Sequence, residues 1–165
     1  MVKIARTEFS FLPRCLPGAD VVVGDARLTL AKEPAGLFDY LLIDAFSSDS
    51  IPVHLLTREA LQLYLDKLSP DGLLTLHISN RHLELESVAA ALAASINGVN
   101  AAFVKDLRKA TIDASPSSVM VISRSASALA PVLALPGARP AGRSTTAVWT
   151  DDFSNVLAAL IRNYW

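Results

Sequence analysis

The chain has 165 residues, of which 52% are hydrophobic and 19% are charged, and its formal net charge at neutral pH is -1. This composition is typical of a globular protein with a substantial core, and it argues against a broad nucleic-acid-binding surface. No apolar run approaches the ~20 residues that a membrane-spanning helix needs, and residues 1–6 are too few and too charged for a signal peptide.

Helices and strands are predicted to alternate in the first part of the chain. Residues 1–8 have the character of the end of a helix, and the β-branched run at 19–25 predicts a short strand that ends in Gly24-Asp25. A brief helix is expected at 26–32. The apolar run at 38–43, bounded by turn formers, predicts a strand that is buried on both faces.

The same alternation continues through the rest of the chain. Thr57 is the expected N-cap of a helix, Ser69-Pro70-Asp71-Gly72 predicts a turn, and Thr150-Asp151-Asp152 is expected to cap the last helix. Pro131 is expected to limit its helix to about one turn. Helices are predicted at 57–68, 83–96, 127–135 and 153–164, and strands at 73–79, 99–105 and 118–123. This order predicts an α/β layer fold with a mostly parallel sheet.

An acidic residue, Asp44, directly follows the strand at 38–43. Ligands of open α/β sheets bind beyond the carboxyl ends of the strands, so Asp44 lies where chemistry is expected. Residues 33–57 contain no lysine or arginine, and they carry the carboxylates Glu33, Asp39, Asp44 and Asp49. This acidic stretch favours a cationic ligand. The alternative is that Asp44 only caps the following turn or helix.

Asp25 is a second acidic residue at the end of a predicted strand. It is either a hydrogen-bond acceptor for a ligand such as an adenine amino group, or the N-cap of the helix that begins at Ala26. The seven glycines never form G-x-G, and the chain has no G-K-S/T motif. Nucleotide binding by the usual glycine-rich loops is therefore not supported. A hydrolase of the G-x-S-x-G type is not supported either.

The three histidines, His54, His77 and His82, do not have the spacing of a metal site. His54 follows the acidic stretch and is a candidate proton shuttle. His77 lies in an apolar strand and either faces the ligand-binding cleft or is a hydrogen-bonded core residue. A structural role is favoured for both His54 and His77. The single cysteine, Cys15, excludes an internal disulfide and fits a reducing compartment, so a cytoplasmic location is expected.

Several segments resemble one family, the spermidine synthase-like proteins. The segments occur in the family's order: Val22–Ala26, Leu42–Phe46, Leu68–Leu74 and Thr150–Asn155. The longer segment Asp44–Thr57 is similar in particular to bacterial members often fused to a membrane transporter-like region. The resemblance covers residues 2–160. It implies a Rossmann-like α/β sheet of the S-adenosylmethionine-dependent methyltransferase type, with helices on both faces.

The resemblance also implies a function and the residues that carry it. The function is transfer of an aminopropyl group from decarboxylated S-adenosylmethionine to a small amine such as putrescine, without a metal. Asp44 would accept a proton from the amine, Asp25 and Ala26 would contact the nucleoside of the co-substrate, and Asp49 and His54 would bind the amine. Spermidine synthases space the two acids as Asp-x-x-Asp, whereas four residues separate Asp44 and Asp49 here. This spacing leaves the amine open. A methyltransferase that uses S-adenosylmethionine with another acceptor, and a non-catalytic interaction module, are the alternatives.

The family's first strand, its glycine-rich loop and its ribose-binding acid would precede Met1. We therefore expect a single domain, 1–165, that is incomplete at its N-terminus and lacks the first two strands. Its binding of the co-substrate is expected to be weak or absent. That the fragment is inactive is an open alternative. Without these two strands, the strands beside them would have unpaired backbone N–H and C=O groups. Either the strands at 21–23 and 40–43 pair directly, or protomers form a homo-oligomer through the exposed edge. The resemblance to transporter-fused members leaves open whether a membrane region precedes the chain in the intact gene product.

Overall fold

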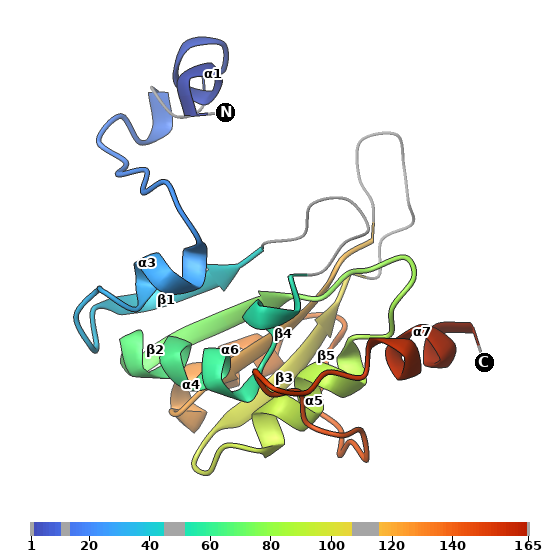
Figure 1. Ribbon diagram of the computed structural model, residues 1–165. Helices are drawn as coiled ribbons and strands as arrows, with labels where there is room; N and C mark the ends of the chain where they lie inside the picture. Colours follow the sequence, from blue (N-terminus) through green and yellow to red (C-terminus); the bar gives the residue numbers. More distant parts are fainter. Residues whose placement is uncertain (1, 11–13, 45–51, 107–115, 165) are drawn as a thin grey trace. The chain divides into compact units, whose positions relative to one another are not determined.

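The computed structural model describes residues 2–10, 14–44, 52–106 and 116–164 (Figure 1). The chain divides into two compact units, residues 1–32 and 33–165.

Two short helices of the first unit lie entirely within the described residues, α1 (Val2–Thr7) and α3 (Ala26–Leu30). Asp25 caps α3, because its Oδ1 accepts a hydrogen bond from the backbone N–H of Leu28 at 2.9 Å. The strand predicted at 19–25 is wrong. Residues 19–24 form no strand, and the side chain of Val23 is 80% exposed. A β-branched composition favours a strand only where a neighbouring strand accepts its hydrogen bonds.

The second unit is built on a five-stranded sheet in the order β1-β2-β4-β3-β5. The strands are β1 (Phe38–Ile43), β2 (Leu68–His77), β3 (Asn100–Lys105), β4 (Ser118–Ser123) and β5 (Ala138–Pro140). β1 and β2 are parallel, whereas the other three pairings are antiparallel. The predicted α/β class is confirmed, but the mostly parallel sheet is wrong. β3 and β4 follow each other in the sequence with a polar segment between them, and consecutive strands without a crossover helix become antiparallel neighbours.

Helices cover both faces of this sheet, as predicted (Figure 1). On one face Leu129 of α6 (Ala126–Leu133) packs with Ala102 and Val121. The helices α4 (Arg58–Lys67) and α5 (Glu86–Ala94) lie on the other face. The sheet side chains that alternate with Val121 are almost fully buried: Leu74, Leu76, Met120 and Ile122. The result is a three-layer α/β/α unit with two apolar interfaces.

Pro131 does not limit its helix to one turn, because α6 continues to Leu133. The chain after this proline still forms hydrogen bonds, from Ala134 N–H to Pro131 O and from Leu135 N–H to Val132 O. Proline lacks its own N–H and crowds the carbonyl four residues before it, but it leaves the bonds of the residues after it intact. The prediction was therefore too restrictive.

The start of α4 is tied to a distant segment of the chain. Thr57 is the N-cap, as predicted, and its Oγ1 accepts a hydrogen bond from Ala60 N–H at 3.2 Å. The same hydroxyl donates to Oδ1 of Asp151 at 2.8 Å. Arg58 N–H donates to the carbonyl of Trp149 at 2.9 Å, and Trp149 is fully buried. These bonds hold the segment 149–151 against the first turn of α4.

The predicted cap of the last helix is wrong, because the segment 149–151 is bound to α4 instead. The helix α7 spans Val156–Tyr164, and its first turn is capped by Asn155, whose Oδ1 accepts from Ala158 N–H at 2.9 Å. Asp151 is instead bound to Thr57, and its N–H donates to Oε2 of Glu59 at 3.0 Å. A carboxylate near a helix start suggests a cap in the sequence, but a partner 94 residues away uses it here.

The pairing of β1 with β2 contains a register shift. Phe38 pairs with Leu68, but Tyr40 pairs with Leu73, so residues 69–72 bulge opposite a single residue of β1. The segment 69–72 was predicted as a turn and is part of β2 instead. A Cβ on Gly72 would lie 3.0 Å from the carbonyl oxygens of Phe38 and Ser69, so only glycine fits this bulge without rearrangement. Beyond the bulge the register is regular and ends with Ile43 opposite Leu76.

β1 is an edge strand, and in the described part of the chain it pairs only with β2. Tyr40 is 56% exposed and Leu42 is 49% exposed, so the prediction of a strand buried on both faces is wrong although its bounds, 38–43, are right. The direct pairing of residues 21–23 with 40–43 is also wrong, since 19–24 form no strand. Association of protomers through this edge stays a prediction.

Candidate active site

The candidate site lies where β1 and β2 end. The two strands are parallel, and Ile43 pairs with Leu76. Asp44 and His77 therefore follow this pair side by side, at the carboxyl ends of the two strands. His77 Nδ1 lies 2.7 Å from Asp44 Oδ1. The Asp44 side chain is 52% exposed and that of His77 is 28% exposed, so a ligand can reach the carboxylate.

The chemistry of the two groups fixes the direction of this hydrogen bond. An ionised carboxylate can only accept, so the imidazole Nδ1 must carry the hydrogen and donate it. The length of 2.7 Å is that of a charge-assisted hydrogen bond. In the part of the chain that the structure describes, Asp44 Oδ2 has no hydrogen-bond partner. One carboxylate oxygen is thus held by the protein, and the other is left for a ligand.

The other predicted site residues have no described contact with Asp44. Asp49 lies outside the described residues. His54 lies in the 3-10 helix η1 (Val53–Leu55) and is exposed. Asp25 and Ala26 belong to the first unit, where the carboxylate of Asp25 caps α3. Their contact with a nucleoside stays a prediction.

His77 is a site residue for which the sequence left two roles open and favoured the structural one. It is not a core histidine, because more than a quarter of its side chain is exposed. The available signal was positional. His77 ends the strand that follows the Asp44 strand, and neighbouring parallel strands end at one edge of a sheet. Because of the bulge at 69–72, however, the sequence alone does not predict which residue of β2 lies beside Asp44.

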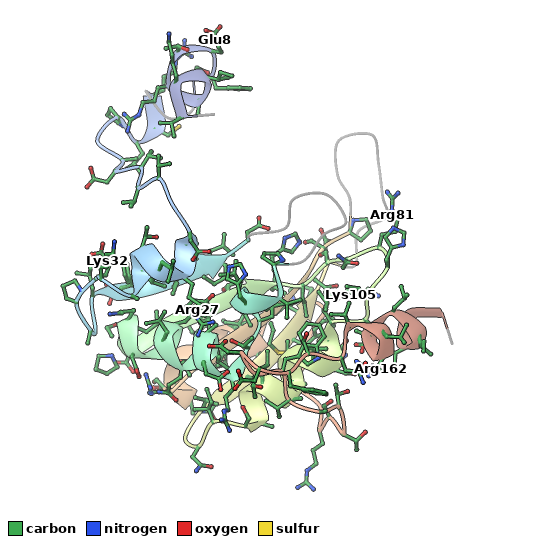
Figure 2. The ribbon with its side chains drawn as sticks, viewed as in Figure 1. Glu8, Arg27, Lys32, Arg81, Lys105 and Arg162 are labelled. Carbon is green, nitrogen blue, oxygen red and sulfur yellow. The ribbon has the colours of Figure 1, made fainter. Side chains whose placement is uncertain are left out.

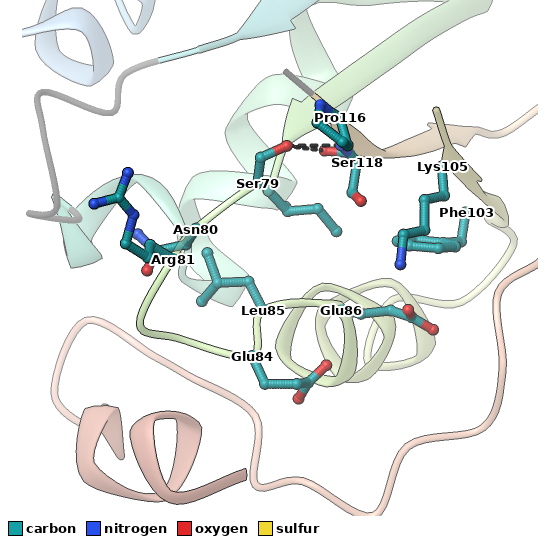
Figure 3. A pocket seen from close by; sticks show the side chains of 11 residues that line it. Ser79, Asn80, Arg81, Glu84, Leu85, Glu86, Phe103, Lys105, Pro116 and Ser118 are labelled. Atoms are coloured by element: carbon teal, nitrogen blue, oxygen red, sulfur yellow. Dashed lines mark hydrogen bonds between the residues drawn. The ribbon is translucent and has the colours of Figure 1, made fainter. Parts of the chain in front are cut away.

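A cavity of about 670 Å³ lies beyond the ends of β2 and β3 (Figure 3). Its lining residues come from the loop after β2, from the start of α5, from β3 and from the start of β4 with the residues just before it: Ile78, Ser79, Asn80, Arg81, Glu84, Leu85, Glu86, Phe103, Lys105, Pro116 and Ser118. Ser79 Oγ accepts from Ser118 N–H at 2.6 Å, which ties the loop after β2 to the start of β4. Ser79, Asn80 and Arg81 thus line this cavity.

The charges of the cavity differ from those at Asp44. Oε2 of Glu84 accepts from Nε of Arg162 at 3.1 Å. Glu86 is paired with Arg139, whose guanidinium lies 4.4 Å from the ring centroid of Phe103. Both carboxylates are therefore already neutralised, and two further cationic side chains, Arg81 and Lys105, line the same cavity (Figure 3). Figure 2 labels these two side chains on the whole ribbon. A cationic ligand is better accommodated at Asp44.

No three His, Cys, Asp or Glu side chains among the described residues are grouped so that they could hold a metal ion. None of the described helices combines the length and the apolar character required to traverse a bilayer.

No family model matches the chain. A segment of 76 residues is 40% identical to the polyamine aminopropyltransferase of Vibrio vulnificus (strain CMCP6), and it represents 44% of this chain and 24% of that protein. This segment is homologous to a polyamine aminopropyltransferase.

Two solved structures have the same fold. One is a probable spermidine synthase from Corynebacterium glutamicum ATCC 13032, with a TM-score of 0.63 and 16% identity, covering 93% of this chain and 61% of that one. The other is the spermidine synthase from Thermotoga maritima, with a TM-score of 0.55 and 15% identity, covering 96% of this chain and 53% of that one. The predicted spermidine synthase-type, methyltransferase-like α/β fold is confirmed. The chain spans between about a quarter and three fifths of the length of these relatives.

Proposed function

We propose that this aminopropyltransferase-like chain transfers an aminopropyl group from decarboxylated S-adenosylmethionine to a small amine such as putrescine. The observation that carries the proposal is the exposed carboxylate of Asp44, which the end of β1 presents with one oxygen held by His77 and the other without a partner among the described residues. The homologous segment of a polyamine aminopropyltransferase supports the same chemistry.

The carboxylate of Asp44 suits the alkylation of an amine. An amine is mostly protonated at neutral pH and is then not nucleophilic, and a carboxylate both attracts the cation and accepts its proton. As the nitrogen attacks the carbon next to the sulfonium, the C–N bond forms and the C–S bond breaks. The electron pair of the C–S bond stays on sulfur, which leaves as the neutral thioether methylthioadenosine. The proton released from nitrogen goes to Asp44.

The remaining work of the site is alignment of the nucleophile with the electrophilic carbon. We assign the nucleoside contact to Asp25 and Ala26, and binding of the amine to Asp49 and His54. Since the sequence has no G-x-G loop, a low affinity for the co-substrate is expected. The free, exposed Cys15 fits a reducing, cytoplasmic location.

A comparison of two co-substrates tests this proposal. The chain is incubated with putrescine and millimolar decarboxylated S-adenosylmethionine, or with ordinary S-adenosylmethionine, and the products are identified by mass spectrometry. We expect methylthioadenosine and spermidine from the first mixture and no product from the second. A methylated acceptor from the second mixture would instead support a methyltransferase. An absence of product from both would support a non-catalytic module.

We also propose that two copies of the chain associate through β1. An edge strand exposes a row of unpaired N–H and C=O groups, and the apolar side chains of Tyr40 and Leu42 are exposed on the same strand. Pairing of β1 with β1 of a second copy would satisfy the backbone groups and cover these side chains.

Light scattering tests this association with two leucine variants. We expect the wild-type chain to be a dimer and Leu42→Lys to be a monomer, because a charge at the interface opposes burial. Leu157→Lys is the matched control, since Leu157 is 65% exposed on α7 and should leave the dimer intact. A monomeric wild-type chain, or a dimer that persists in Leu42→Lys, would rule out this interface.

A further inference from the structure

We propose that His77 is a positioning residue for Asp44: its Nδ1–H holds Oδ1, so that Oδ2 faces the amine and receives its proton. This inference rests on the proposed function and adds a residue from the neighbouring strand to the site. The carboxylate and the imidazole come from β1 and β2, and the 2.7 Å hydrogen bond links the two strand ends.

The backbone of His77 is held more rigidly by the sheet than that of Asp44. β2 lies between β1 and β4, and His77 itself pairs in register with Val119 of β4. The preceding residue of β2, Leu76, is 1% exposed. Asp44, by contrast, follows the last residue of an edge strand, and its side chain is 52% exposed. A half-exposed side chain without a partner would occupy several rotamers, and a hydrogen bond to a fixed donor selects one of them.

The hydrogen bond gives the two carboxylate oxygens of Asp44 different roles. Oδ1 already accepts the Nδ1–H hydrogen, so the oxygen with room for the ammonium group is Oδ2. When the amine attacks, its proton moves to Oδ2, and the Nδ1–H···Oδ1 bond can persist because the protonated carboxyl still has an acceptor oxygen. No proton needs to cross between His77 and Asp44. His77 therefore acts on the reaction through Asp44 and not as a base.

Two substitutions separate this role from simple packing. The amide nitrogen of asparagine occupies nearly the place of histidine Nδ1, so His77→Asn keeps a donor to Oδ1. His77→Leu places a methyl group there and removes the donor. In the proposed transferase assay we expect kcat to fall roughly 10-fold or more in His77→Leu, because the carboxylate that accepts the proton is no longer held in its productive orientation. The KM for decarboxylated S-adenosylmethionine should be unchanged, and His77→Asn should recover most of the rate.

His82→Leu is the control for these variants, because His82 lies in the loop after β2 and should be replaceable without loss of kcat. Thermal unfolding of each variant checks that the chain is folded. Equal loss of kcat in His77→Asn and His77→Leu, or a loss that follows the melting temperature, would overturn the inference.

A second measurement does not depend on turnover. Nitrogen-15 NMR of the three histidines, at a pH where the imidazoles are neutral, reports which ring nitrogen carries the hydrogen. We expect the Nδ1–H form for His77 in the wild-type chain, and loss of that preference in Asp44→Ala but not in Asp39→Ala. An unprotonated Nδ1 in the wild-type chain would overturn the inference even if the enzyme is active. The Nδ1–H form in a chain without any turnover would overturn the proposed function and reduce His77 to a structural residue.

Discussion

Replacing Asp44 with asparagine is expected to lower kcat for aminopropyl transfer about 100-fold or more, the usual contribution of a positioned general base. The amide has the shape of the carboxylate, and its oxygen can still accept the hydrogen bond from His77. It has no negative charge to attract an ammonium group and cannot take up the proton of the attacking nitrogen. The measurement is the initial rate of methylthioadenosine release with putrescine as acceptor.

Asp39→Asn is the matched control for this substitution. Asp39 lies near the other end of β1, and its carboxylate also accepts a hydrogen bond from the neighbouring strand, from Ser69 Oγ at 2.7 Å. The two variants therefore remove the same charge from the same strand and differ in the end of the sheet that they affect. Asp39→Asn should keep nearly the full rate. Equal losses in both variants, or an almost unchanged rate in Asp44→Asn, would remove Asp44 from the reaction.

Replacing Trp149 with alanine is expected to lower the free energy of unfolding by about 3–5 kcal/mol, the usual cost of truncating a buried aromatic residue. Trp149 is among the largest of the fully buried side chains in the described structure. Its carbonyl accepts from Arg58 N–H, and the nearby Asp151 accepts from the hydroxyl of Thr57. A cavity at this position would therefore also loosen the attachment of the segment 149–151 to α4. Denaturant unfolding followed by circular dichroism measures the change.

Two further substitutions make this stability measurement specific. Phe153→Ala removes another aromatic side chain from the same segment, but Phe153 is 49% exposed, so a loss under about 1 kcal/mol is expected. Trp149→Phe keeps an aromatic ring and removes the indole N–H, for which the described residues provide no partner. It should therefore cost less than Trp149→Ala. Equal stabilities of Trp149→Ala and the wild-type chain would show that this residue does not anchor the segment.

The sequence predicted those elements whose signals are local. The apolar run at 38–43 and the β-branched run at 118–123 have the same bounds in the structure. The N-cap Thr57 marked the start of α4, because the side chain and the N–H group that it accepts from are only three residues apart. The run at 19–25 has an equally local signal and failed, since whether a strand forms depends on a partner elsewhere in the chain.

The same difference between local and long-range signals applies to the candidate site. Asp44 was found because a strand end is a position that the sequence reveals. His77 was not, because its contact with Asp44 depends on how many residues the bulge at 69–72 absorbs. Asp151 was assigned to the wrong helix for a similar reason, since its partner Thr57 is distant in the sequence. Contacts between distant segments depend on register and packing, which composition and periodicity do not encode.

The central claim is that the carboxylate of Asp44 takes the proton of an amine during aminopropyl transfer. The most direct test measures methylthioadenosine release from decarboxylated S-adenosylmethionine, with and without putrescine, for the wild-type chain, Asp44→Asn and Asp39→Asn in parallel. We predict putrescine-dependent release by the wild-type chain and by Asp39→Asn, and almost none by Asp44→Asn. Release that does not depend on putrescine, or that is equal in all three proteins, would contradict the claim.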